Sequence, residues 1–270
     1  MSLHIPMPSL GYGTYGRRGA DGVQAIRQAL EAGFRHLDTA QDYQTEAEVG
    51  QAIRESGLAR QMVYVTTKVA TSHLGPGQLI ASLQASLTAL NLDQIDLALI
   101  HWPAPNGEIE PEVYLAELKN AQESGLCRDI GVSNFTIPLL ERAKTLLGPG
   151  ALTCNQVELN PLFKNHKLAD HCDAGFIRVT CYLPMARGRL SGNPTIAAIA
   201  AAHGRTGEQI GLAWELARGY AAIPTSSRPE RIIAAHAAGS ITLNPAEIAA
   251  IDAMPDAPRI IAPAWGPAWD

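Results

Sequence analysis

Four side chains that could carry proton transfer follow one another along the chain. Asp38, Lys68 and His101 are separated by 30 and 33 residues, and Tyr43 lies five residues beyond Asp38. A phenol has an ordinary pKa of about 10, which is too high for efficient proton transfer near neutrality. An ammonium beside Tyr43 would lower that pKa, and Asp38 would keep the ammonium of Lys68 charged. His101 could hydrogen-bond a substrate oxygen as charge moves onto it.

Three of the four also have an ordinary structural interpretation. Asp38 could cap a helix, Lys68 could be a solvated strand end, and His101 could be a core histidine. The functional interpretation requires that all four meet at one place. The elements that carry them decide whether they do.

Each of these polar residues ends a short apolar segment of β-strand character. Ile95–Ile100 is apolar at every position except Asp96, as expected of a parallel strand buried on both faces. Intervals near 30 residues are the length of one βαβ unit. Similar ends follow at Ser133, Gln156, Tyr182 and Thr225. The last interval is 43 residues long and predicts two helices, the second opened by a capping box of Thr206 and Gln209.

Eight strand candidates alternate with segments of helical period. They lie at residues 10–14, 35–38, 63–68, 95–101, 128–133, 153–158, 178–183 and 220–224. This α/β pattern predicts a (β/α)8 TIM barrel, a single domain over residues 1–270 with its sites at the carboxyl ends of the strands. A doubly wound dinucleotide-binding sheet is the alternative, because Asp38 ends the second strand. Gly11–Gly16, however, does not follow the GxGxxG pattern of that sheet.

Composition argues against several other classes of protein. The formal charge is -5, and no run of Lys or Arg is long enough to bind nucleic acid. Met1–Pro8 lacks the pattern of a secretory signal, and Ile196–Ala202 is far shorter than the roughly 20 residues that span a bilayer. The four cysteines have no CxxC spacing, which indicates reduced thiols. We expect a cytoplasmic protein that binds neither nucleic acid nor membrane.

Several separated segments resemble the signatures of the aldo-keto reductase superfamily. They are Gly33–Ala40 with Tyr43, Val65–Lys68, Leu99–Pro103 and Gly131–Phe135. Ile223–Arg228 and the ending Gly266–Asp270 are similar to the subgroup of bacterial 2,5-diketo-D-gluconate reductases B. The resemblance covers nearly the whole chain. It implies a (β/α)8 barrel, NADPH as hydride donor, and a catalytic tetrad of Asp38, Tyr43, Lys68 and His101 with Tyr43 as general acid.

The resemblance also implies where the cofactor binds. Ser133, Asn134 and Gln156 would hydrogen-bond the nicotinamide carboxamide, and Tyr182 would stack on the ring. A helix-capping turn at Ser133 and Asn134, and a core position for Tyr182, are the structural alternatives. The residues expected to bind the cofactor are Gly13, Thr14, Asp38, Ser133, Asn134, Gln156, Tyr182, Leu183, Met185, Thr225, Ser226, Ser227, Arg228 and Arg231.

The end of the eighth strand offers a phosphate site. Ser226, Ser227, Arg228 and Arg231 supply hydroxyls and positive charge at a helix start, where barrel enzymes commonly bind phosphate. An ordinary helix start with solvated charges is the alternative. Thr225 stands where many relatives have Lys. Ala234 and Ala235 replace a usual Glu-Asn pair, and Leu183 replaces a usual Ser. NADPH is the expected cofactor, and these departures raise the prospect of NADH use.

The substrate is expected to contact Tyr43, His101, Trp102 and Trp265. Trp269 could line the same pocket or anchor the tail against a helix.

His166 and His171 are five residues apart, a spacing that does not place two ligands on one helix face, so no metal is expected. The family suggests a monomer.

These observations predict an NADPH-dependent oxidoreductase that reduces aldehydes and ketones to alcohols. The expected substrate is 2,5-diketo-D-gluconate or a related small dicarbonyl. A broad-specificity aldehyde or methylglyoxal reductase is the first alternative. A non-catalytic barrel that senses NADPH is the second, and the complete tetrad argues against it.

Overall fold

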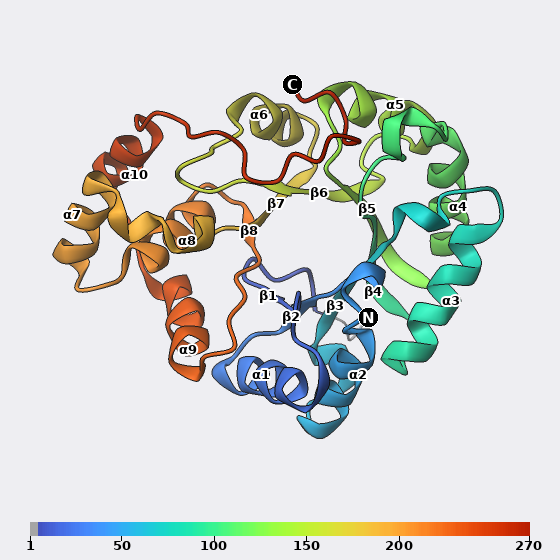
Figure 1. The fold of residues 1–270 in the computed structure, drawn as a ribbon, viewed down its shortest axis with the longest axis horizontal. Coiled ribbons are helices and arrows are strands. Elements are labelled where there is room, and N and C mark those ends of the chain that lie inside the picture. Colours follow the sequence, from blue (N-terminus) through green and yellow to red (C-terminus); the bar gives the residue numbers. More distant parts are fainter. Residues whose placement is uncertain (1–4) are drawn as a thin grey trace.

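Eight parallel strands form one sheet in sequence order in the computed structural model, which describes residues 5–270. They are β1 (Tyr12–Gly13), β2 (His36–Asp38), β3 (Tyr64–Val69), β4 (Ile95–Ile100), β5 (Cys127–Ser133), β6 (Leu152–Glu158), β7 (Arg178–Tyr182) and β8 (Ala221–Ala222). Figure 1 shows the strands surrounded by a ring of helices.

Helices connect successive strands. The α-helices of the described chain are α1 (Gly19–Ala32), α2 (Glu46–Glu55), α3 (Gln78–Leu90), α4 (Pro111–Glu123), α5 (Ile137–Leu147), α6 (His166–Ala174), α7 (Pro194–His203), α8 (Gly207–Ala217), α9 (Pro229–Ala237) and α10 (Pro245–Asp252). Short 3-10 helices are η1 (Gln41–Tyr43), η2 (Arg60–Met62), η3 (Thr71–His73), η4 (Pro105–Gly107), η5 (Ala186–Gly188), η6 (Leu190–Gly192) and η7 (Ala238–Ser240).

The first and last strands meet and close the sheet into a barrel. Leu10 forms a parallel bridge with Ala222. The amide of Gly13 donates to the carbonyl of Pro224 at 2.9 Å. A Cβ on Gly13 would lie 3.0 Å from Cγ2 of Ile223, so a glycine permits this close approach. The (β/α)8 barrel is confirmed, and the doubly wound alternative is wrong.

The regular parts of β1 and β8 are shorter than the sequence predicted. Residues 10–14 and 220–224 were the expected strands, but the paired segments are Tyr12–Gly13 and Ala221–Ala222. Pro224 has no amide hydrogen, which limits the ladder at that end of β8. The two helices predicted in the long last interval are α7 and α8. The capping box of Thr206 and Gln209 at the start of α8 is confirmed.

The core has two layers, as expected of a filled barrel. A large apolar cluster fills the space between strands and helices. Inside the barrel, Tyr64, Leu97, Leu99 and Cys154 form a separate buried cluster, against which Ile5 and Met7 pack.

All four cysteines are free and buried, in agreement with the predicted reduced thiols. Within residues 5–270 no helix has the length and apolar character needed to cross a membrane.

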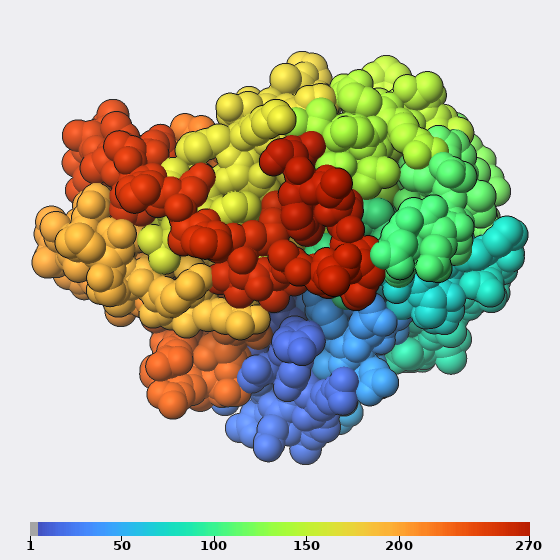
Figure 2. Space-filling view, turned by 45° about the horizontal axis from the view of Figure 1, so that its top comes forward, coloured from blue at the N-terminus to red at the C-terminus, as the bar shows by residue number. Residues whose placement is uncertain are grey.

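The segment that follows α10 crosses the molecule and is tied down along its length. The amides of Ile260 and Ile261 donate to the two carboxylate oxygens of the buried Glu158, each at 2.7 Å. The carboxylate of Asp270 accepts from the amide of Ile137 at the start of α5, at 3.0 and 3.1 Å. Figure 2 shows this red segment lying across the middle of the face. The segment after α10 is therefore held against the rest of the molecule by specific hydrogen bonds.

Glu215 has a buried carboxyl group without a hydrogen-bond partner among the described residues. It lies in α8 with none of its surface exposed, and neither oxygen has a hydrogen-bond partner among the described residues. Burial raises the pKa of Glu215 well above its ordinary value. The folded state therefore holds a proton on this carboxyl that the unfolded chain releases near pH 4 to 5.

Replacing Glu215 with Met should stabilise the protein by about 1–3 kcal/mol near neutral pH, because it removes a buried polar group without partners. Since the folded state raises the pKa, the stability of the wild type is fullest below the unfolded pKa and falls as pH rises through the folded pKa. The advantage of Glu215→Met should therefore grow with pH. Urea unfolding of the wild type and the variant at about pH 5, 7 and 9 measures the difference in their free energies of unfolding. Glu123→Met, at an exposed position on α4, is the control, and an advantage that does not change with pH would contradict the argument.

Candidate active site

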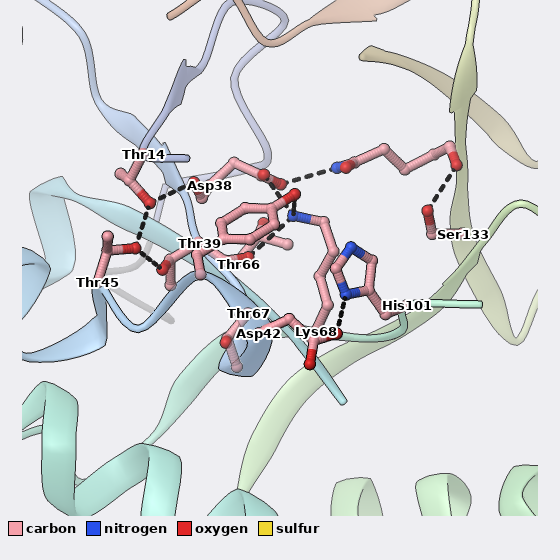
Figure 3. A network of polar contacts seen from close by, with 12 residues as sticks. Thr14, Asp38, Thr39, Asp42, Thr45, Thr66, Thr67, Lys68, His101 and Ser133 are labelled. Atoms are coloured by element: carbon pink, nitrogen blue, oxygen red, sulfur yellow. Dashed lines mark hydrogen bonds and ion pairs between the residues drawn. The ribbon is translucent and has the colours of Figure 1, made fainter. Parts of the chain in front are cut away.

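The four predicted catalytic residues meet at one end of the barrel. Asp38 ends β2, Lys68 lies near the end of β3, and His101 directly follows β4. Tyr43 ends η1, the turn that follows β2. Figure 3 shows the side chains of Asp38, Lys68 and His101 converging on this region. The sequence spacing of about one βα unit produces this, because parallel neighbours end at the same face.

Lys68 is the centre of the cluster. Its side chain is fully buried and forms an ion pair with Asp38, whose side chain is 3% exposed. The ammonium also donates to the carbonyl of Thr39 at 2.9 Å and to the Tyr43 hydroxyl at 3.4 Å. Burial lowers the pKa of Lys68, but Asp38 and then Tyr43 act in the opposite direction and leave it above the ordinary value. Lys68 therefore stays charged, as predicted.

The net direction of the Tyr43 pKa differs from the prediction. Lys68 does lower this pKa, but burial raises it more strongly and the charge of Asp38 adds to that, so the pKa lies above 10. The sequence revealed the ammonium but not the desolvation of the phenol, which depends on tertiary packing. Tyr43 is accordingly protonated at neutral pH, which is the state that a proton donor needs.

His101 is held by a carboxylate that the sequence analysis missed. Its Nδ1 lies 3.0 Å from Oδ2 of Asp42, the residue directly before Tyr43 in η1. The imidazole meets the Tyr43 ring edge to face, with centroids 5.5 Å apart. Burial, together with the charge of Lys68, lowers the pKa of His101, although Asp42 opposes this. The only sequence signal for Asp42 was its adjacency to Tyr43.

Buried threonines support the turn that carries Tyr43. The hydroxyl of Thr14 donates to the carbonyl of Asp38 at 3.0 Å and lies 3.0 Å from that of Thr45. The Thr45 hydroxyl in turn lies 2.9 Å from that of Thr39 (Figure 3). The side chain of Thr14, predicted to contact the cofactor, is thus turned inward and positions the strand end. Gly13 is likewise buried at the barrel seam.

The residues predicted to bind nicotinamide form one connected group beside the tetrad. Gln156 donates to Oδ2 of Asp38 at 2.7 Å, and its carbonyl accepts from the Ser133 hydroxyl at 2.8 Å. Asn134 donates to the carbonyl of His101 at 3.1 Å and accepts from the Tyr182 hydroxyl at 2.8 Å. Amides, a hydroxyl and a half-buried aromatic ring therefore gather next to Asp38 and His101.

The predicted phosphate residues gather at the start of α9. Thr225, Ser227, Arg228 and Arg231 are exposed, and Ser226 is half-buried. The Ser226 hydroxyl accepts from the amide of Arg228 at 3.1 Å, while its carbonyl accepts from the hydroxyl of Tyr12. A narrow cleft is lined by Met185, Thr225, Ser226 and Arg231 among others. The residues predicted to bind phosphate therefore lie together, directly after β8.

The loop after β7 is compact and has unusual backbone geometry. Leu183, Ala186 and Arg187 have φ values of 50°, 45° and 57°, in the left-handed region that favours glycine. Arg187 and Arg189, which the sequence left as either pyrophosphate ligands or solvated residues, are both exposed.

Three tryptophans form an aromatic cluster next to His101. Trp102 meets Trp265 with centroids 5.2 Å apart and Trp269 at 6.0 Å. The guanidinium of Arg259 lies 3.6 Å from the Trp269 ring centroid. The sequence left Trp269 either as a pocket residue or as an anchor against a helix. The structure joins it to the aromatic cluster through Trp102.

Comparison with known proteins identifies the class. A sequence model of the Aldo/keto reductase family matches residues 9–256. The chain is 40% identical over 267 residues to methylglyoxal reductase DkgB of Salmonella typhimurium, which covers 98% of this chain and 100% of the relative. It is 39% identical over 229 residues to 2,5-diketo-D-gluconic acid reductase B of a Corynebacterium species, covering 84% and 81% of the two chains. The chain belongs to the aldo/keto reductase family.

A solved structure agrees with this assignment. The crystal structure of a Bombyx mori aldo-keto reductase in complex with NADP has a TM-score of 0.87 and 33% identity, covering 95% of this chain and 92% of that one. Family membership makes the protein an NADP-dependent oxidoreductase, as predicted. Among residues 5–270 no group of three or more His, Cys, Asp or Glu side chains could hold a metal ion.

Removing Asp38 should leave the Lys68 ammonium buried without its counter-ion. We expect Asp38→Asn to lower the free energy of unfolding by about 3–5 kcal/mol, the usual cost of breaking a buried pair. The double variant Asp38→Asn/Lys68→Met should lose less, because both charges are gone. Urea unfolding of the wild type, of Asp38→Asn and of Asp38→Asn/Lys68→Met measures this. Equal losses in the single and double variants would contradict a buried ion pair.

Proposed function

We propose that the protein reduces aldehyde and ketone carbonyls with NADPH and that small sugar-derived dicarbonyls such as 2,5-diketo-D-gluconate are its substrates. The observation that carries this is the contact of buried Lys68 with both Asp38 and the Tyr43 hydroxyl. A protonated phenol beside a buried ammonium is an acid whose anion is stabilised in place. Methylglyoxal is the second candidate substrate, favoured by the 40% identity to methylglyoxal reductase DkgB.

NADPH, when bound, supplies a hydride for the carbonyl carbon. Tyr43 donates its proton to the carbonyl oxygen, and Lys68 stabilises the negative charge left on the phenolate oxygen. Asp38 keeps Lys68 charged and in place within the barrel. His101 borders the same space, edge to face with the Tyr43 ring. Trp102 and Trp265 supply apolar surface for the rest of the substrate.

The chain also has the chemistry to hold NADPH. Ser133, Asn134 and Gln156 supply the hydroxyl and amide groups that a carboxamide needs, and Tyr182 supplies a ring face. Ser226, Ser227, Arg228 and Arg231 supply hydroxyls and positive charge for a 2′-phosphate. Gly13 and Thr14 lie where the first and last strands meet, and we expect Leu183, Met185 and Thr225 to contact the cofactor as well. We place the function in a single cytoplasmic domain, residues 1–270, that acts as a monomer.

Turnover assays with both substrates test the proposal. Oxidation of NADPH is followed by absorbance with 2,5-diketo-D-gluconate and with methylglyoxal, and each assay is repeated with NADH. A higher kcat/KM for the sugar acid supports the proposed substrate class. A higher kcat/KM for methylglyoxal assigns the second candidate. No turnover with tight NADPH binding would make the protein a sensor barrel.

Tyr43→Phe removes the proton donor without removing the ring. We expect kcat to fall at least about 10²–10⁴-fold, the typical contribution of general acid catalysis. The Kd for NADPH, measured by quenching of protein fluorescence, should stay close to that of the wild type. Tyr15→Phe is a matched control, because Tyr15 packs edge to face on Tyr43 but is 68% exposed. Wild-type turnover by Tyr43→Phe would require another acid.

Arg231→Ala removes a positive charge from the start of α9. We expect the Kd for NADPH to rise about tenfold or more, the cost of losing hydrogen bonds to a charged group. The Kd for NADH, which lacks the 2′-phosphate, should hardly change. Arg54→Ala, at an exposed position on α2, is the control. An equal rise in the Kd for NADPH and for NADH would show that Arg231 does not bind the 2′-phosphate.

A further inference from the structure

The contact between Asp42 and His101 has a consequence for the kind of carbonyl that the site accepts. We propose that Asp42 is a positioning residue that fixes the proton of His101 on Nδ1, so that Nε2 accepts a hydrogen bond from a hydroxyl beside the reacting carbonyl. The enzyme would thereby select hydroxylated carbonyl compounds. This deepens the proposed function and rests on it.

The hydrogen-bond partners determine which ring nitrogen carries the proton. Nδ1 of His101 lies 3.0 Å from Oδ2 of Asp42. The hydrogen bond from His101 lowers the pKa of Asp42, so this side chain is a carboxylate at neutral pH. An ionised carboxylate can only accept, and Nδ1 must therefore donate. A neutral imidazole has one donor and one acceptor, so Nε2 carries the lone pair.

The surroundings of His101 keep the ring neutral. Burial is the largest effect and lowers the pKa of His101, and the ammonium of Lys68 lowers it further. Asp42 and Asp38 oppose this, and His73 acts on Asp42 from η3. Since the net direction is downward, a second proton binds only below the ordinary range of histidine. Only then would Nε2 become a donor.

In this arrangement Tyr43 and His101 form different hydrogen bonds with the substrate. Tyr43 donates to the carbonyl oxygen, and its ring lies edge to face against His101. A carbonyl oxygen set directly against Nε2 would face a lone pair and gain no hydrogen bond, so in this arrangement His101 does not donate to the reacting oxygen as the sequence suggested. A neighbouring hydroxyl of the substrate can donate there instead. The 5-ketone of 2,5-diketo-D-gluconate has hydroxyl-bearing neighbours, whereas unhydrated methylglyoxal has none.

Two ketones of nearly equal size isolate the effect of the hydroxyl. Hydroxyacetone and 2-butanone differ in a hydroxyl against a methyl group, so the ratio of their kcat/KM values measures hydroxyl preference. Comparing that ratio between the wild type and Asp42→Ala cancels the intrinsic reactivity of each ketone. Asp42→Ala frees His101 to place its proton on Nε2, which then donates to any carbonyl.

We expect the ratio to fall about tenfold in Asp42→Ala, the worth of one hydrogen bond exchanged between neutral partners. Most of the change should come from faster reduction of 2-butanone. Asp21→Ala, at an exposed position in the first turn of α1, is the matched control and should keep the wild-type ratio. An unchanged ratio in Asp42→Ala would overturn the proposal.

The tautomer itself is measured by long-range ¹H–¹⁵N NMR of the histidine rings in the full-length protein near neutral pH, with His101→Gln assigning the signal. The wild type should show protonated Nδ1 and unprotonated Nε2 at His101, and Asp42→Ala should shift the ring toward protonated Nε2. A wild-type ring protonated on Nε2 would overturn the proposal. If neither ketone nor any aldehyde is reduced, the proposed function fails, and the spectrum still decides the role of Asp42.

Discussion

The buried ion pair of Lys68 and Asp38 is the constraint on which the active site depends. A fully buried ammonium is tolerated only with a counter-ion and hydrogen-bond acceptors around it. Asp38, the carbonyl of Thr39 and the Tyr43 hydroxyl supply these contacts, and Gln156 engages the second oxygen of Asp38. The contacts that stabilise the charge of Lys68 are therefore the same contacts that position the Tyr43 hydroxyl.

The same contacts connect the tetrad to the groups proposed for the cofactor. Gln156 joins Asp38 to Ser133, and Asn134 joins the carbonyl of His101 to the hydroxyl of Tyr182. Strands β2 to β7 thus contribute to one polar network around the barrel mouth. Because each member holds the next, the orientation of Tyr43 depends on strands that are far apart in sequence.

The C-terminal segment completes the site from outside the barrel. Glu158 holds the amides of Ile260 and Ile261, and the carboxylate of Asp270 binds the start of α5. Between these anchors, Trp265 and Trp269 pack on Trp102 beside His101. A segment without regular secondary structure is thereby fixed through its main-chain amides and the side-chain carboxylate of Asp270, which satisfies groups that would otherwise be left unpaired.

The sequence by itself predicted the barrel and the meeting of Asp38, Lys68 and His101 at one face, because strand ends repeat at the length of a βα unit and parallel strands end at one face. The class of enzyme came from the resemblance of separate sequence motifs to the aldo/keto reductases. Tertiary structure alone decided how those groups behave. The raised pKa of Tyr43, the proton held by Glu215 and the partner of His101 follow from burial and from contacts between separate elements. Desolvation depends on every neighbouring atom, and residue spacing along a chain does not contain it.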